Sequence, residues 1–589
     1  MSFSAIVPRR DRIAVLVGGA VAFTVGEQVV EGIRPALLLD PDPAWAIPRF
    51  LLWIALLSAA SAAGALAAGL FFLWRRSEWF PLIPTALPFR RKTLALVAGG
   101  ALLAGTALRF VALDRIPPSL WVDDVSLIAP ALALKGDLSD LADTVRAAPY
   151  GVPQPYGSVG VLYLELYRLA LVLVGETVFG IRFLSAVAGV LSLVTAMFLG
   201  RALLPRGGGA LAALVLAGLR WHVLMSRWAW NAIVLAPIAD LAALLLLRAR
   251  RRGSLLLGAA SGLVAGLATH IYLAAWIVGA ALLALAVWPD ERGSSGVSRL
   301  RLALTFTATF ALAAAPLFLL KEGRTSPYFA RASDHNLWRE VGYMHSPLPA
   351  FAAVADSLTA PWFAIEPYGH HDLPGTTRLN VLLGVAVAVA FARSLVRPLE
   401  PFSAYLLANA AVALAASVAG GHAGLPNSYR FTYLTTATAV AAAGGILCIL
   451  GRFVGPPRRL AALVAIGLLS VSGALAARDA LLRWPARRET FDGFHGADTL
   501  LGRSMLRWER YGDVVLAADL ENTRITLEGV RRYRLDPDYL REAPRGSSRG
   551  REFRVVPPGS TPREGDRLVE RIGDAWGREW GWVYGRTER

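Results

Sequence analysis

Two adjacent carboxylates, Asp123 and Asp124, follow Trp121 in a hydrophilic stretch between long apolar segments. An aspartate at the start of a helix accepts backbone N–H bonds and suits the helix dipole. Capping needs only one such side chain, however, and two neighbouring carboxylates repel each other. A carboxylate in a loop can instead act as a general base that takes the proton from an attacking hydroxyl. The pair therefore has two interpretations, a helix cap and a catalytic base, and its surroundings must decide between them.

The chain around this pair has the composition of an integral membrane protein. Its 589 residues are 55% hydrophobic and only 17% charged, whereas soluble domains carry about 25% charged residues. The apolar residues come in blocks of about 20, the length at which a helix crosses a bilayer. We therefore predict an all-α polytopic membrane protein with about 13 transmembrane helices, extracytoplasmic loops and a small C-terminal α/β soluble domain.

The net charge of +17 arises largely from short arginine clusters between the apolar blocks. Examples are Arg75-Arg76, Arg248–Arg252 and Arg458-Arg459. Such clusters are typical of cytoplasmic loops, so the charge indicates membrane orientation and argues against a nucleic-acid partner. They place the loop 113–154, which carries Asp123 and Asp124, on the extracytoplasmic side together with the C-terminus. We expect a multi-pass protein of the cell inner (plasma) membrane, with membrane lipids as partners.

The predicted organisation has three parts. They are an additional N-terminal transmembrane hairpin over 1–92, a transmembrane catalytic domain over 93–484, and a C-terminal extracytoplasmic domain over 485–589. The chain must pass from the outside at residue 154 to the inside at residue 248, which requires an odd number of crossings. Because four apolar runs lie between these positions, we expect one of them to be an incomplete span, within 208–247. The single cysteine, Cys448, excludes a disulfide within the chain and a cysteine-based metal site.

An extracytoplasmic loop has no access to nucleotide sugars, so group transfer there requires a lipid-linked donor. The sequence from Trp121 to Asp124 and the helical stretch after it resemble the acidic motif loop of the glycosyltransferase C superfamily. The resemblance is nearest to family 39, the protein O-mannosyltransferases and aminoarabinose lipid A transferases. It covers about residues 93–450, because further stretches agree in order. These are Phe179–Ala186, Ser226-Arg227 with Asn231, Gly262–Gly266 with Tyr272, and Asn427–Tyr433.

The resemblance implies a polyprenyl-phosphate sugar as donor and inversion at the anomeric carbon, with Asp123 as catalytic base. Asp124 would orient the acceptor or bind a divalent cation, and no cofactor is otherwise implied. The sequence departs from the family pattern in three places. The second acidic residue of the pair is Asp124, where the pattern has Glu. His270 stands near the position where relatives have Lys, and Asn231 stands where they often have Asp.

A departing lipid phosphate requires cations, and arginine holds two phosphate oxygens at once. The candidates for donor phosphate binding are Arg227, Arg430, Lys321 and Arg324. The candidates for acceptor or sugar binding are Tyr429, Tyr433, His422, Glu366 and Tyr272. We interpret Arg182 as a structural arginine on the cytoplasmic side. His370-His371-Asp372 has no identifiable third ligand and is not assigned as a metal site.

The predicted function is an integral membrane glycosyltransferase, hexosyl or pentosyl, that glycosylates a hydroxyl on a lipid, glycan or protein acceptor in the cell envelope. The sequence names neither the sugar nor the acceptor. The alternative is a flippase or transporter of a lipid-linked or anionic solute, although the inverted repeats of many transporters are not evident. A third hypothesis is a structural assembly factor whose C-terminal domain binds partners.

Overall fold

The computed structural model describes residues 85–134, 160–289, 296–317, 369–419, 431–517, 525–537 and 551–587. They belong to one compact unit, Ile83–Arg589. The predicted N-terminal hairpin lies outside the described residues, except for its last few positions from 85 onward.

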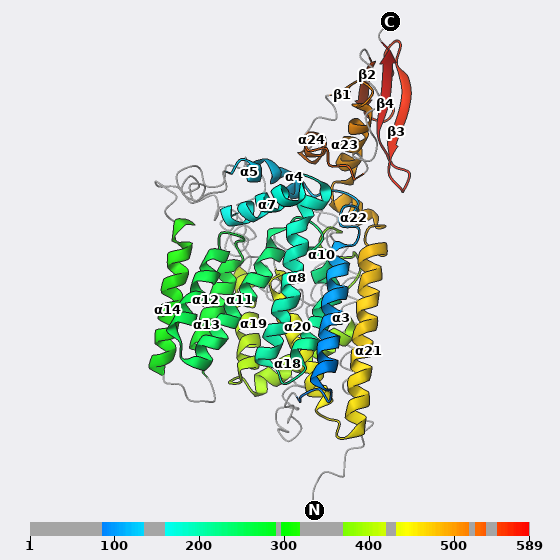
Figure 1. Cartoon of the computed structure of the whole chain (residues 1–589). Coiled ribbons are helices and arrows are strands. Elements are labelled where there is room, and N and C mark those ends of the chain that lie inside the picture. Colours follow the sequence, from blue (N-terminus) through cyan, green and yellow to red (C-terminus); the bar gives the residue numbers. More distant parts are fainter. Residues whose placement is uncertain are drawn as a thin grey trace, which may run out of the picture. The chain divides into compact units, whose positions relative to one another are not determined.

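Apolar helices make up most of the described chain (Figure 1). The helices of the bundle are α3 (Arg91–Phe110), α8 (Val178–Leu203), α9 (Gly208–Ala217), α11 (Asn231–Arg252), α12 (Leu255–Ala268), α13 (Ala275–Val287), α14 (Gly296–Ala314), α18 (Val381–Val396), α19 (Pro401–Ala419), α20 (Leu434–Leu450) and α21 (Pro456–Arg478). Shorter helices gather toward one end of it: α4 (Val122–Ser126), α5 (Ile128–Leu132), α7 (Val161–Val174), α10 (Arg220–Met225) and α22 (Arg488–Gly493). We call this end, where α4 carries the two aspartates, the Asp123 end.

Five of the described helices are by themselves long and apolar enough to cross a membrane. They are Arg91–Phe110, Val178–Leu203, Asn231–Arg252, Ser298–Leu317 and Pro456–Arg483. The pair formed by Val381–Val396 and Pro401–Ala416 also passes this test but is bent by 106°. The predicted class, a mostly helical protein with several apolar helices, is confirmed. The number of about 13 spans and the side of the membrane on which each loop lies stay predictions.

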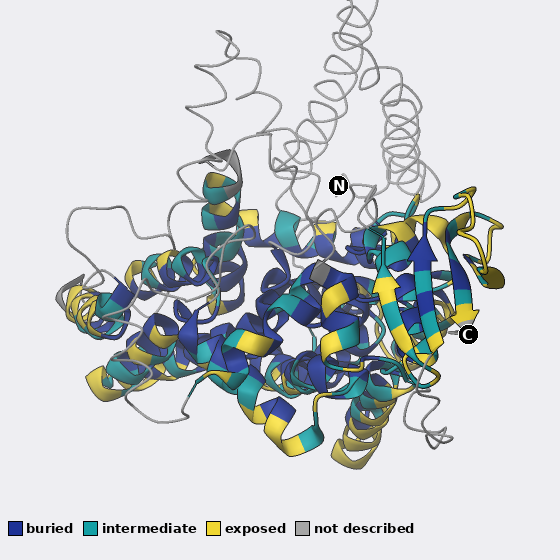
Figure 2. Ribbon diagram, turned by 90° about the horizontal axis from the view of Figure 1, so that it is seen from above, coloured by how far each residue is buried: buried dark blue, intermediate teal, exposed yellow. Residues whose placement is uncertain are grey.

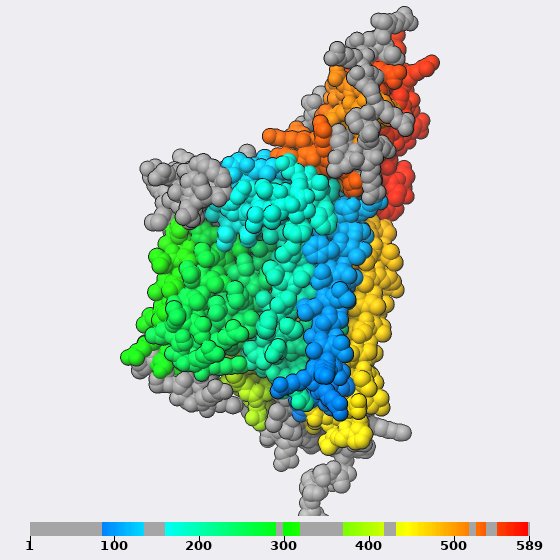
Figure 3. Space-filling model, viewed as in Figure 1, coloured from blue at the N-terminus to red at the C-terminus, as the bar shows by residue number. Residues whose placement is uncertain are grey.

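The bundle is layered by hydrophobicity. The central helices α9 and α20 are apolar all round and bury nearly every residue, as expected for helices surrounded by other helices. The outer helices α3 and α21 expose leucines, such as Leu96 and Leu460, and form part of the outer surface in Figure 3. Figure 2 shows that buried residues gather in the middle of the bundle and exposed ones at its periphery. Small residues allow close helix packing: a Cβ added to Gly262 of α12 would lie 2.2 Å from the carbonyl oxygen of Phe306 in α14.

The segment predicted as the span after the aspartate loop forms a short helix, α7. Its 14 residues extend only about 21 Å, less than the roughly 30 Å of a hydrocarbon core, and they include Glu165 and Arg168. Gly175, with φ +97°, ends α7 in a conformation suited to glycine. Thr177 then caps α8 by accepting a bond from the Gly180 N–H at 3.1 Å.

The incomplete span predicted within 208–247 agrees with the described helices, because α9 is an apolar helix of only 10 residues. In the same stretch α11 has the length of a full span. The segment before α11 is nevertheless broken, because α9 ends at Ala217 and α10 starts at Arg220.

A mixed sheet follows the bundle, accompanied by helices α23 (Gly496–Trp508) and α24 (Ile525–Arg532). Its strands are β1 (Asp513–Leu516), β2 (Arg551–Val556), β3 (Arg567–Gly573) and β4 (Glu579–Thr587), in the order β1-β2-β4-β3. β1 pairs with β2 in parallel, and the other pairs are antiparallel. Leu501 and Met505 of α23 pack against Phe553 and Val583 in a small core. The predicted domain boundaries at 92 and 484 stay predictions.

Candidate active site at the Asp123 end

The structure gives the two adjacent aspartates different environments. Asp124 is fully buried; its Oδ2 accepts the backbone N–H of Trp121 at 3.0 Å and its Oδ1 that of Ala229 at 2.9 Å. Asp123 is partly exposed, and its Oδ2 accepts the indole N–H of Trp121 at 3.1 Å. Asp124 therefore caps α4 and ties it to the α10–α11 connection, whereas Asp123 is the more exposed of the two carboxylates.

Burial raises the pKa of Asp124 to about 6, although the charge of Arg182 and the two backbone N–H bonds act in the opposite direction. The folded protein therefore holds more protons at this site than the unfolded chain between about pH 4 and pH 6. The stability contributed by Asp124 falls as the pH rises through this window and is constant above it. We expect the thermal unfolding midpoint of wild type to show this slope, and Asp124→Asn to lack it. A difference between the two proteins that develops only above pH 7 would contradict the assignment.

Arg182 holds the segment that leads to Asp123. This fully buried side chain donates from Nη1 to the carbonyls of Leu113 and Pro117, both at 3.0 Å, and from Nη2 to that of Ser119 at 2.7 Å. The loop 111–124, which we call the Asp123 loop, thereby gains partners for three inward-facing carbonyls. Arg182 lies in the first turns of α8 beside this loop, so the predicted cytoplasmic-side position of Arg182 and the predicted extracytoplasmic position of the loop cannot both hold.

Arg227 contacts the same loop from the α10–α11 connection. Its Nη1 donates to the carbonyl of Leu108 at 2.6 Å, and its Nη2 donates to that of Val111 at 2.8 Å, with longer contacts to Ala112 and Ile116. These carbonyls include the otherwise unpaired end of α3, which a cation stabilises. The predicted phosphate role of Arg227 is not supported by these contacts, which instead anchor the loop.

The C-terminal helices complete the support of the loop. Thr499 of α23 accepts the Leu120 N–H at 3.2 Å, and Arg503, one turn later, donates to the Pro118 carbonyl at 3.0 Å. In α24, a Cβ added to Gly529 would lie 2.6 Å from the Cβ of Val125 in α4. The Asp123 loop is thus held by side chains from α8, the α10–α11 connection and α23. Sequence analysis gave no sign of the last contact.

Aromatic rings line the loop beside Asp123. The Trp121 ring stacks on His370 with centroids 4.3 Å apart, and His495 lies tilted at 5.1 Å. Asp372, next to the histidine pair, accepts a bond from Arg220 at 2.8 Å, so it is engaged in an ion pair. In the described part of the chain no three candidate metal ligands come together.

Of the predicted sugar or acceptor residues, Tyr272 and Tyr433 are described. Tyr272 follows α12 at the Asp123 end and packs edge-on against Trp230 at 6.3 Å. Tyr433 precedes α20 and is buried. The remaining predicted residues lie outside the described ranges: Arg430, Lys321, Arg324, Tyr429, His422 and Glu366.

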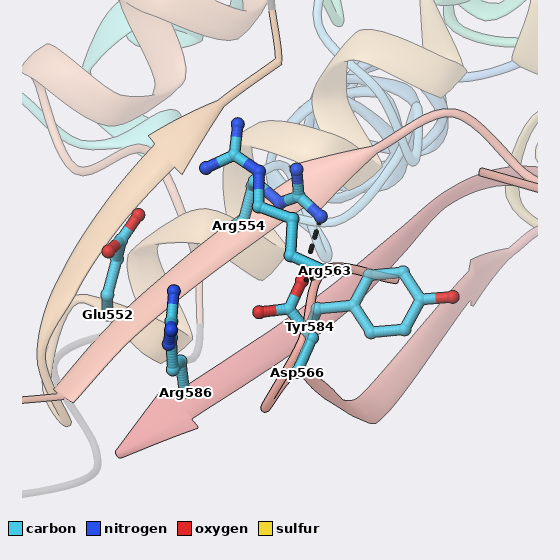
Figure 4. A pocket seen from close by; sticks show the side chains of 6 residues that line it. All are labelled: Glu552, Arg554, Arg563, Asp566, Tyr584 and Arg586. Carbon is cyan, nitrogen blue, oxygen red and sulfur yellow. Dashed lines mark hydrogen bonds and ion pairs between the residues drawn. The ribbon is translucent and has the colours of Figure 1, made fainter. Parts of the chain in front are cut away.

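A small, solvent-open pocket lies elsewhere, on the C-terminal sheet (Figure 4). It is lined by Glu552, Arg554, Arg563, Asp566, Tyr584 and Arg586. Arg554 forms an ion pair with Asp566 at 2.8 Å, and Glu552 lies opposite Arg586 across β2 and β4. Its three arginines are only partly offset by its two carboxylates, and none of the predicted site residues lines it.

Comparison with known proteins supports the resemblance. Residues 160–319 match the family model described as dolichyl-phosphate-mannose-protein mannosyltransferase. This stretch contains Arg182, Arg227 and Tyr272. The resemblance to the glycosyltransferase C superfamily predicted from the sequence is confirmed. Comparison with curated protein sequences finds no match.

Three solved structures illustrate the similarity of this chain to known folds. The oligosaccharyltransferase of Archaeoglobus fulgidus is 16% identical with a TM-score of 0.41, over 76% of this chain and 59% of its own. ArnT from Cupriavidus metallidurans bound to undecaprenyl phosphate is 14% identical with a TM-score of 0.44, over 84% and 98%. Arabinosyltransferase EmbB from Mycobacterium smegmatis is 13% identical with a TM-score of 0.36, over 73% and 42%.

Proposed function

We propose that the chain is a membrane glycosyltransferase that moves a sugar from a polyprenyl-phosphate donor to an acceptor hydroxyl on the extracytoplasmic side. The observation that carries the proposal is the difference between the two aspartates. Asp124 is buried and accepts two backbone N–H groups, whereas Asp123 is partly exposed. The family matched over 160–319 is named for a dolichyl-phosphate sugar, which supports a lipid-linked donor. The hydrophobicity of the bundle suits a substrate that enters from the bilayer.

In the proposed reaction, the oxygen of the acceptor hydroxyl attacks the anomeric carbon of the donor sugar. A carboxylate oxygen of Asp123 takes the proton of that hydroxyl during the attack. The bond between that carbon and the phosphate oxygen breaks, and its electron pair stays with the polyprenyl phosphate. One displacement inverts the anomeric centre. Arg430, Lys321 and Arg324 are the proposed cations for the leaving phosphate, since the guanidinium of Arg227 is engaged with backbone carbonyls.

The test uses the purified full chain in lipid nanodiscs with undecaprenyl phosphate carrying a radiolabelled hexose or pentose. A transferase releases undecaprenyl phosphate and moves the label to an acceptor in a lipid, glycan or peptide extract. The transport alternative predicts a different result in proteoliposomes: the labelled lipid changes leaflet while its sugar–phosphate bond stays intact. Translocation without any bond cleavage would overturn the proposal.

The contact between Thr499 and the Asp123 loop provides a test of loop positioning. Thr499→Val keeps the shape of the side chain but removes the acceptor for the Leu120 N–H, and Thr499→Ser keeps the hydroxyl. We expect the valine variant to lose about tenfold in kcat, with the donor KM little changed, because a small displacement of a catalytic group is costly. Serine should restore most of the rate. Equal losses in the two variants would mean that side-chain shape, rather than the hydrogen bond, is what matters.

A further inference from the structure

Several buried polar atoms at the Asp123 end have no hydrogen-bond partner within the described part of the chain, and four of them belong to α7, the start of α11, the turn after α12 and the residue before α20. They are the hydroxyls of Tyr163 and Tyr433, Oδ1 of Asn231 and Nδ1 of His270. The four residues are only 0%, 5%, 6% and 4% exposed, in that order. An unpaired buried polar atom costs about 1–3 kcal/mol, and native proteins retain few of them. Four of them in adjoining segments indicate a polar occupant.

Three of the four residues lie in the turn 269–274 between α12 and α13 or contact its backbone. The Tyr163 N–H of α7 donates to the His270 carbonyl at 3.4 Å, and a Cβ on Gly160 would lie 1.8 Å from the same oxygen. The amide nitrogen of Asn231, at the start of α11, donates to the Ile271 carbonyl at 3.2 Å. Tyr433 directly precedes α20, and Tyr272 adds to the effect of burial in raising the pKa of Tyr433.

One of the four residues, Tyr163, is linked to the two aspartates. Tyr163 stacks on Tyr167, one helical turn away, with centroids 5.9 Å apart and planes 12° apart. The Tyr167 hydroxyl donates to the backbone carbonyl of Asp124 at 2.9 Å. The charges of Asp124 and Asp123 add to the effect of burial in raising the pKa of Tyr163, so its hydroxyl lies within electrostatic range of both carboxylates.

The unpaired atoms select one kind of ligand. Nε2 of His270 contacts the Ala313 carbonyl at 2.9 Å and must donate to it, and burial lowers the pKa of this histidine, so Nδ1 is an acceptor. Oδ1 of Asn231 is also an acceptor, and the two phenols both donate and accept. Phosphate oxygens carry no donor and would be repelled by the two acceptors. A molecule with several hydroxyls can satisfy all four positions.

We propose that Tyr163, Asn231, His270 and Tyr433 form the subsite for the donor sugar and accept an uncharged, polyhydroxylated ring. The inference rests on the proposed function, since it takes the occupant to be the sugar of a lipid-linked donor. It separates sugar recognition from phosphate binding, and it gives His270 and Asn231, both departures from the family pattern, a role in selecting the sugar.

The test compares binding of undecaprenyl phosphate glucose with binding of undecaprenyl phosphate to wild type, Tyr163→Phe and Tyr433→Phe in nanodiscs. Each variant should bind the glucose lipid about five- to tenfold more weakly, the value of one hydrogen bond, and the bare lipid unchanged. Without lipid, each should be as stable as wild type or more so, because an unpaired buried hydroxyl has been removed. Tyr405→Phe, a buried tyrosine of α19, is the matched control and should bind both lipids normally.

Equal losses for both lipids would overturn the subsite in favour of a phosphate or structural role, and unchanged affinities would show that these atoms bind only water. Tighter binding of undecaprenyl phosphate carrying an amino sugar or a uronic acid would overturn the preference for an uncharged ring. Sugar-dependent binding without turnover of any donor would contradict the transferase and leave the subsite intact. If Tyr163→Phe and Tyr433→Phe turn over the donor normally and their affinities for both lipids equal those of wild type, the subsite is contradicted but the proposed transferase function is not.

Discussion

Asp123→Asn is expected to lower kcat by about 10² to 10⁴, the usual contribution of a general base. Asparagine has the same shape and can still accept the Trp121 indole N–H through its amide oxygen, so the loop should keep its structure. It cannot take a proton from the acceptor. Binding of undecaprenyl phosphate should therefore be unchanged within about twofold while transfer is lost.

Asp114→Asn is the matched control, because Asp114 lies in the same loop, partly exposed beside Arg115. It should transfer at nearly the wild-type rate. Transfer by Asp123→Asn within tenfold of wild type would contradict the assignment of Asp123 as base. A parallel loss of lipid binding would instead show that the carboxylate is needed to build the site.

Arg182→Lys is expected to lower kcat by about 100-fold, although the residue contacts no reactant. An ammonium group cannot reach three carbonyls in the fork geometry of a guanidinium. Buried acceptors left unpaired cost about 1–3 kcal/mol each, so the unfolding midpoint should also fall by several degrees. Displacing the Asp123 loop by about 1 Å is sufficient for a rate loss of this size.

The measurement separates a positioning role from general destabilisation. The donor KM of Arg182→Lys should change little while kcat falls, even at temperatures where the variant is fully folded. Arg201→Lys, at the exposed far end of the same helix, should match wild type. If Arg182→Lys loses stability but keeps its rate, the arginine supports the fold without placing Asp123.

Hydropathy and motif order predicted much of this structure because both are local signals. Apolar blocks revealed the helices, and the adjacent aspartates revealed the loop between α3 and α7. Aspartate is favoured at helix N-termini, and this preference predicted capping as one of the two interpretations of the pair. Asp124 has this contact, since its two oxygens accept backbone N–H groups.

The support of the loop could not be predicted, because its contacts join distant positions. Arg182 and Arg227 look alike in sequence as charges within apolar runs, and such residues are expected to serve function. Their partners are backbone carbonyls, which no sequence pattern marks. Thr499 lies 379 positions from Leu120, whose N–H it accepts.

The configuration of the product tests the central claim most directly. Polyprenyl-phosphate donors of known anomeric configuration would be turned over by the full chain, and the linkage formed would be determined by NMR. A single displacement assisted by Asp123 predicts that every donor yields the opposite anomer. Retention of configuration would require a covalent or ion-pair route in which Asp123 is not the base for the acceptor, and it would contradict the mechanism proposed for this site.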